Sequence, residues 1–269
     1  MSQLKLEHLA APLVAAALGR SLGVEVRFGS QGAPRTNGEV IFIPSLPLEV
    51  PDRARTQLWG FIHHEAMHIR QTDFPVFEII AAENDELLRH LFNILEDVRG
   101  EAAQFRLYPG SQKVLRDTMI ELVESGFFAD PEPDISPAAL VCGFLIRELR
   151  LSVLGQLAFD KQAQVYRSLL VHALGESFTT RLVAIATHVV GAVSSQESID
   201  IAYQFRALIE EENQSLADDS DPSGADSPSS AGSDDPTSIS VSGAEPQGEP
   251  PNEDTSVSST AVNPEGRSS

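Results

Sequence analysis

The sequence is poor in cysteine, and this shortage limits both its covalent chemistry and its compartment. Cys142 is the single cysteine among 269 residues, so the chain cannot form an internal disulfide. It lies in an apolar run, residues 138–146, where a thiol usually packs as a small hydrophobic group. The apolar stretch at residues 9–18 is short and fits an amphipathic helix better than a signal peptide. We therefore expect a soluble, cytoplasmic protein.

Basic residues are also scarce, which argues against several classes of partner. Lysine and arginine number 19 against 39 acidic residues, and the formal charge is −20. Thirteen of the acids follow residue 210, so the rest of the chain is only mildly acidic. Such a surface offers no basic stripe for phosphates, and its acidic end would repel nucleic acid and anionic lipid. No run approaches the roughly 20 consecutive apolar residues of a membrane span. We predict neither nucleic-acid nor membrane binding.

Large apolar residues become rare after residue 212, where serine, aspartate, glycine, proline and glutamate dominate. A segment of this composition cannot bury enough apolar surface to offset the entropy of ordering. We predict that residues 213–269 form a disordered acidic tail or linker.

The remaining sequence predicts a little strand followed by many helices. Residues 24–28 alternate in polarity, residues 38–44 form a β-rich run, and a turn signal lies between them, so the runs form a hairpin or two neighbouring strands. Helical spacing of apolar residues follows over 51–74, 84–105, 114–125, 136–157, 163–174, 178–193 and 199–212. The order indicates a small sheet near the N-terminus and a helical bundle after it.

The strongest chemical signal is His64-Glu65-Ala66-Met67-His68, a His-Glu-x-x-His motif on an expected helix. Histidines four residues apart project from one helical face, the geometry for two ligands of zinc. With a third protein ligand, zinc keeps a position for water and lowers the pKa of that water toward about 7. Glu65 is then placed to take the proton as a general base. A di-iron bundle would need a second Glu-x-x-His, and the chain has none.

A third ligand is expected from the helix at residues 84–105, which carries three acids near its end. Glu96 is our first choice. Asp97 and Glu101 are alternatives, either as the ligand or as the carboxylate that orients a ligand histidine through its second nitrogen. These acids would otherwise pair with Arg99 and Arg106 on a solvated face.

Three segments together resemble one known family. They are Thr-Asn-Gly-Glu-Val-Ile-Phe-Ile-Pro at 36–44, Gly-Phe-Ile-His-His-Glu-Ala-Met-His-Ile-Arg-Gln-Thr-Asp at 60–73, and Leu-Phe-Asn-Ile-Leu-Glu-Asp-Val-Arg-Gly-Glu at 91–101. In this order they resemble the zincin-like domain that precedes a von Willebrand factor A domain in cobaltochelatase CobT-type and nitric oxide reductase activation NorD-type proteins.

The resemblance implies a metallopeptidase-like fold with the β-run beside the cleft and the acidic helix completing the metal site. It also implies an acidic linker into a von Willebrand factor A domain and a partnership with a MoxR-type AAA+ ATPase. These 269 residues contain no Asp-x-Ser-x-Ser segment followed by an α/β pattern. We therefore expect either that the von Willebrand factor A domain lies on another polypeptide, or that this sequence is a fragment or a shortened relative of these proteins.

The predicted fold is α+β and mainly helical, with a zincin-like metallopeptidase core around a small sheet. We place a metal-binding domain at residues 1–125, a helical subdomain packed on it at 126–212, and the acidic tail at 213–269.

Two functions follow. In the first, the chain is a zinc metallopeptidase: His64, His68 and Glu96 hold Zn²⁺, Glu65 is the general base, and the edge of strand 38–44 aligns an extended peptide or protein substrate. In the second, it is a non-catalytic adaptor or assembly module whose tail recruits a partner. Because a structural zinc site is closed by four protein ligands and has no use for Glu65, the sequence favours the peptidase.

Overall fold

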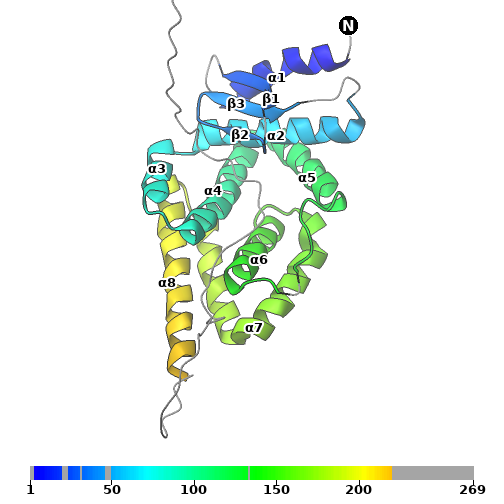
Figure 1. Ribbon diagram of the computed structural model, residues 1–269. Helices are drawn as coiled ribbons and strands as arrows, with labels where there is room; N and C mark the ends of the chain where they lie inside the picture. The colour runs from blue at the N-terminus through cyan, green and yellow to red at the C-terminus, as the bar shows by residue number, and fades with distance from the viewer. Residues whose placement is uncertain (1–2, 20–23, 31, 46–49, 133, 220–269) are drawn as a thin grey trace, which may run out of the picture.

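The computed structural model describes residues 3–19, 24–30, 32–45, 50–132 and 134–219, and helices dominate it (Figure 1). The α-helices are α1 (Gln3–Gly19), α2 (Asp52–Gln71), α3 (Phe74–Ala82), α4 (Glu86–Leu107), α5 (Pro109–Glu124), α6 (Pro137–Ser152), α7 (Asp160–Ala186) and α8 (Ser195–Asp219). Two short 3-10 helices, η1 (Leu157–Phe159) and η2 (Thr187–Val190), flank α7. The expected mainly helical α+β composition is confirmed. Helix α3 was not predicted.

Three strands form one small sheet: β1 (Glu25–Ser30), β2 (Arg35–Thr36) and β3 (Val40–Pro44), in the order β1-β3-β2. Strand β3 runs parallel to β1 and antiparallel to β2. The two predicted runs are therefore neighbouring strands and not a hairpin. The tight turn joins β2 to β3 instead, where the Asn37 side chain accepts hydrogen bonds from the backbone N–H groups of Glu39 and Val40.

The position of β3 corrects one sequence-based expectation. We expected the edge of residues 38–44 to align an extended peptide, but β3 is hydrogen-bonded on both sides. The β1 ladder covers β3 over Val40–Pro44 and the β2 ladder covers Ile41 and Phe42, so β3 is the central strand and β1 and β2 are the outer strands.

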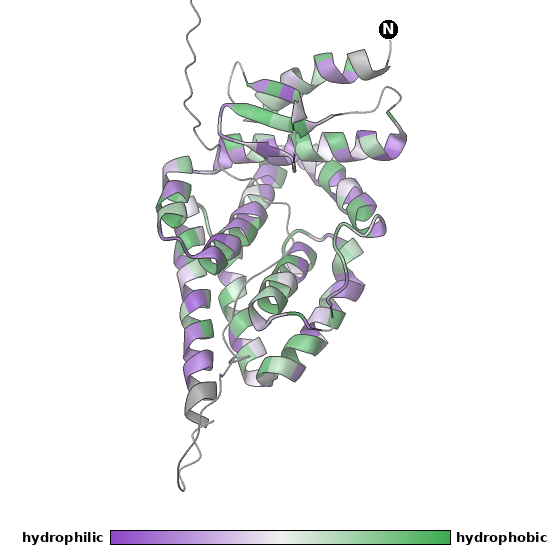
Figure 2. Cartoon of the chain, viewed as in Figure 1, coloured by the Kyte–Doolittle hydropathy of each residue, from purple (hydrophilic) through white to green (hydrophobic). Residues whose placement is uncertain are grey.

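The sheet, α1 and α2 share a hydrophobic core. In β3 the side chains of Ile41 and Ile43 are buried while the residues between them are partly exposed, as the alternation of a strand requires. Figure 2 shows β3 as strongly hydrophobic. The other buried members are Ala11, Ala15 and Leu18 of α1, Val24 before β1, and Leu58, Ile62 and Ala66 of α2.

Two glycines allow other helices to approach α2 closely. A Cβ atom on Gly60 of α2 would lie 2.0 Å from the Thr118 hydroxyl of α5, and one on Gly100 of α4 would lie 2.1 Å from the Met67 sulfur of α2. Both distances are far below van der Waals contact, so the crossings depend on the missing side chains. Helix α2 is thereby fixed between the sheet and helices α4 and α5.

A second, larger core fills the rest of the protein, and α4 belongs to it. Its buried residues come from α3, α4, α6, α7 and α8, with Phe92, Phe144 and Phe205 among the largest fully buried side chains. Helix α4 thus packs into the helices that follow residue 126 while it also contacts α2. The division into a domain at 1–125 and a subdomain at 126–212 stays a prediction.

One stretch, Leu157–Val190, is long and apolar enough to cross a membrane when length and composition alone are considered. Its helix is interrupted, however, because Gly175 has non-helical backbone angles (φ 81°, ψ 162°). The side chains of Tyr166, Leu170, Phe178 and Leu182 are buried in the larger core. The break also explains why the sequence predicted two helices, 163–174 and 178–193, in this region.

Helix α8 extends to Asp219, beyond the boundary that we placed at residue 213. Residues 213–219 continue this helix. The rest of the predicted disordered tail, 220–269, lies outside the described residues.

Candidate metal centre

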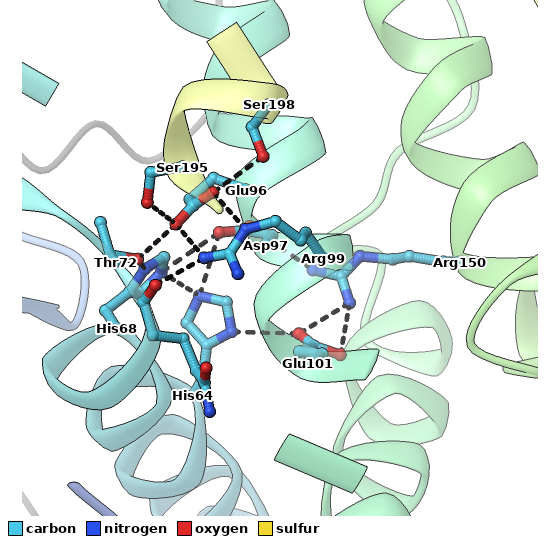
Figure 3. A network of polar contacts seen from close by, with 11 residues as sticks. His64, His68, Thr72, Glu96, Asp97, Arg99, Glu101, Arg150, Ser195 and Ser198 are labelled. Atoms are coloured by element: carbon cyan, nitrogen blue, oxygen red, sulfur yellow. Dashed lines mark hydrogen bonds and ion pairs between the residues drawn. The ribbon is translucent and has the colours of Figure 1, made fainter. Parts of the chain in front are cut away.

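Helices α2 and α4 bring two histidines and one aspartate to a common point (Figure 3). The Nε2 atoms of His64 and His68 lie 3.3 Å apart. The Oδ1 atom of Asp97 lies 3.6 Å from Nε2 of His64 and 3.2 Å from Nε2 of His68. Among the residues that the structure describes, these three form the one group of histidine, cysteine or acidic side chains arranged for a metal ion.

The histidines are held by hydrogen bonds to their other ring nitrogens. Nδ1 of His64 lies 3.0 Å from Oε1 of Glu101, and Nδ1 of His68 lies 2.9 Å from the hydroxyl of Thr72. A carboxylate accepts, so Nδ1 of His64 carries the proton in this contact. Metal-binding histidines usually have such a partner, because it fixes the ring and leaves the second nitrogen for the ion.

Glu96, our first choice for the third ligand, is not brought into this group. Its two carboxylate oxygens accept hydrogen bonds from Arg99 and from the hydroxyls of Thr72, Ser195 and Ser198. Helical spacing explains the difference, since neighbouring residues point about 100° apart around α4. Asp97, named as an alternative, faces the histidines, and Glu96 faces α8.

Glu101 is fully buried and belongs to a second polar network. Arg150 of α6 donates from NH1 to its Oε1 at 3.2 Å, and Gln156 donates from Nε2 to its Oε2 at 3.2 Å. Arg150 also lies near Asp97, with 3.7 Å between NH2 and Oδ2. One arginine therefore compensates charge on both a histidine-orienting carboxylate and the cluster carboxylate, as buried charges require.

The close packing of charges shifts the protonation of the centre. Burial alone would lower the pKa of His64, but the carboxylates of Asp97, Glu101 and Glu65 outweigh it and raise the pKa of His64 to about 9. Burial opposes ionisation of Asp97, yet the two histidines and Arg150 lower its pKa to about 2. The centre in its metal-free form thus holds an ion pair that a cation would replace.

Glu65 lies beside the cluster on the same helix and is almost completely buried. Burial raises its pKa, and the nearby histidines only partly offset this effect. It lines a cavity of about 200 Å³ together with His64, Asp97 and Arg150. The rest of the cavity wall is largely apolar, with side chains such as Phe61, Ile94, Leu115, Met119, Phe128 and Ile146.

Other polar side chains near the motif have different roles. Nδ1 of His63 lies 3.0 Å from the Ser111 hydroxyl, away from the cluster. The Tyr108 hydroxyl donates to the carbonyl of Ala17. Thr72 both ends α2 and accepts a hydrogen bond from His68.

The sequence did not identify Arg150, Gln156, Ser195 or Ser198. A charged residue at a core-facing position of the apolar helix α6 was a usable signal for Arg150. The two serines lie in a stretch rich in helix-capping residues, and only the tertiary structure shows that they point toward Glu96.

The donor set fits a zinc ion. Ligands placed 2.0–2.1 Å from zinc at tetrahedral angles are about 3.3 Å apart, and the three separations here are 3.2, 3.3 and 3.6 Å. Two imidazole nitrogens and one carboxylate oxygen are also a set that zinc accepts.

The chain was compared with known proteins. No curated protein and no solved structure matches it significantly. The family model described as "Cobalamin biosynthesis protein CobT" matches residues 9–265, which confirms the resemblance to CobT-type proteins. The match spans almost the whole sequence, and the chain belongs to the CobT family.

Proposed function

We propose that this chain is a metal-binding assembly module of cobalamin biosynthesis. In this proposal His64, His68 and Asp97 hold a zinc ion, and Glu101 and Thr72 orient the two imidazoles. The observation that carries the metal site is the triangle of Nε2, Nε2 and Oδ1 atoms with the spacing of zinc ligands. The family supports the biosynthetic context.

The assembly role is favoured over proteolysis by the sheet. A metallopeptidase of the kind we expected needs a free strand edge to align its substrate, whereas β3 is the central strand, paired with β1 over Val40–Pro44 and with β2 at Ile41 and Phe42. The partners of the module are proposed from the resemblance: a protein with a von Willebrand factor A domain and a MoxR-type AAA+ ATPase in the cytoplasm. Co-purification of these proteins with the full chain tests this part.

The metal site is tested by elemental analysis of the purified full chain. We expect about one zinc per chain in the wild type and a large loss in His68→Ala and in Asp97→Asn. Glu96→Gln leaves the three ligands in place, so we expect zinc binding to become weaker but not to be lost. His90→Ala is the matched control, because His90 is a histidine of α4 outside the cluster. Zinc that persists in Asp97→Asn but disappears in Glu96→Gln would reverse the ligand assignment.

Peptide hydrolysis is the second candidate, and the position of Glu65 favours it. Zinc bound in this site would supply a Lewis acid that polarises water. Glu65 lines the same cavity as His64 and Asp97, and burial raises its pKa, so this carboxylate takes up a proton more readily than an exposed one does. Casein cleavage that is lost in Glu65→Gln, while zinc is retained, would move the chain to this function.

A further inference from the structure

Glu96 lies where α4 meets the end of α2 and the start of α8 (Figure 3). Its carboxylate is 2% exposed. On Oε1 it accepts hydrogen bonds from the hydroxyls of Thr72 at 2.8 Å and Ser195 at 2.7 Å. On Oε2 it accepts from Ser198 at 2.9 Å. The two serines lie 99 and 102 residues after Glu96 along the chain, so these contacts join parts of the sequence that are far apart.

Arg99 completes the set and leaves Glu96 without capacity for another partner. It donates from Nε to Oε2 at 2.8 Å and from NH2 to Oε1 at 2.5 Å. A carboxylate offers about four lone-pair positions, and five hydrogen bonds already converge on this one. The buried charge is neutralised by the arginine, as a buried carboxylate requires.

The same groups fix the end of α2, where His68 is located. Arg99 donates from NH2 to the carbonyl of Gln71 at 2.6 Å, and the Ser195 hydroxyl accepts from the backbone N–H of Asp73 at 2.9 Å. Thr72, between these residues, is bound to Glu96 directly. Three consecutive residues at the end of α2 are therefore hydrogen-bonded to Glu96 or to one of its partners: Gln71, Thr72 and Asp73.

The direction of the hydrogen bonds determines the state of His68. Thr72 has a single hydroxyl proton. It donates this proton in the hydrogen bond to Glu96, because an ionised carboxylate can only accept. The Thr72 oxygen must then accept from Nδ1–H of His68. In a neutral ring with the proton on Nδ1, Nε2 carries the lone pair, and this nitrogen lies at the point that His68 shares with Asp97 and His64. Glu96 thus selects the ring form that can bind a metal ion.

We propose that Glu96 is a positioning residue of the metal centre, which fixes His68 through Thr72, and that the first turn of α8 is an integral part of this centre. The metal affinity of α2 is then set in part by Ser195 and Ser198. This inference rests on the proposed metal-binding function.

The test uses the full chain in four variants: Thr72→Val, Ser195→Ala, Ser198→Ala and, as a matched control, Thr179→Val. Thr179 is a fully buried hydroxyl in α7 that donates to the carbonyl of Gly175, so it reports the general effect of losing a buried hydroxyl. Zinc affinity is measured by competition with a chromophoric chelator. We expect Thr72→Val to lose about 10–100-fold, as for other residues that orient a metal ligand.

The serine variants keep the test independent of one substitution. Each should bind zinc more weakly than Thr179→Val does, although each leaves Thr72 and every ligand in place. Equal affinity in all four variants and the wild type, or losses in Thr179→Val that match those of the serine variants, would overturn the proposal.

A second readout separates this inference from the proposed function. In the metal-free protein, ¹⁵N-histidine NMR at a pH where the ring is neutral reports which nitrogen of His68 carries the proton. We expect the Nδ1–H form in the wild type and Thr179→Val, and a mixture with the Nε2–H form in Thr72→Val. If the wild type binds no zinc, the proposed function fails while this spectrum still tests the positioning. An unchanged spectrum in Thr72→Val overturns the positioning, even if zinc binds.

Discussion

Substitution of Gly100 by alanine tests whether the approach of α4 to α2 builds the metal centre. The new Cβ would lie 2.1 Å from Sδ of Met67, 3.2 Å from its Cε and 3.3 Å from its Cγ. Met67 is fully buried, so the sulfur has no solvent into which it can move. Overpacking of this kind costs about 1–3 kcal/mol, and the severity of the overlap places it near the upper end. Alanine in a helix interior returns about 1 kcal/mol, which leaves a net loss of about 2 kcal/mol.

The assay is urea unfolding of the metal-free protein, followed by zinc competition. Gly100→Ala should also weaken zinc binding, because the residue lies between Asp97 and Glu101 and the overlap pushes these away from the histidines. A double-mutant cycle isolates the contact. In a Met67→Ala background the same glycine substitution should become stabilising by about 1 kcal/mol, since only the helix propensity remains.

Gly110→Ala is the control, because a Cβ there meets no atom within 4 Å, and it should change the free energy of unfolding by less than about 0.5 kcal/mol. Stabilisation by Gly100→Ala in both backgrounds, with unchanged zinc affinity, would refute the reasoning.

Three further outcomes are expected. Zinc binding at pH 7 should release about one proton, because His64 with its pKa of about 9 is protonated in the metal-free protein. The affinity for zinc should then rise with pH up to about 9. Calorimetry in buffers of different ionisation enthalpy measures the number of protons released, and a release of zero would contradict this prediction. Chelation of zinc should lower the melting temperature, since an ion at 100 times its dissociation constant adds about 2.7 kcal/mol of stability; equal melting curves with and without chelator would count against the site. Glu101→Gln should lower the pKa of His64 and leave Arg150 with a weaker partner, and an unchanged His64 titration by NMR would contradict the ion pair.

The sequence predicted helix α2 and its two histidines well, because the signals for a helix and for its histidine face are local. The four-residue spacing of His64 and His68 determines their common face, and the structure keeps them 3.3 Å apart at Nε2. The choice between Glu96 and Asp97 was not local. One residue of helical rotation separates them, and which one faces α2 depends on how α4 packs against α8.

In the sheet, too, local signals predicted the strands but not how they pair. Residues 24–28 and 38–44 were expected as strands, but they run parallel because the chain turns back through β2, a strand of two residues that is too short to leave a pattern. Helix α3 was missed for a related reason: Phe74 and Pro75 follow the end of α2 closely, and the break between the helices is made by Thr72 and Asp73. Local propensity could not determine where one helix ends and the next begins.

The contact of Glu96 with Ser195 and Ser198 has a consequence for the order in which the protein matures. During synthesis, α2 and α4 leave the ribosome long before α8, so Glu96 first meets only Arg99 and Thr72. Closing a loop of about one hundred residues is entropically costly and slow compared with forming a helix. Helix α2 therefore reaches its final arrangement only when α8, the last described element of the chain, has docked. We expect the nascent protein to gain its full affinity for zinc only after residue 198 has been synthesised and docked.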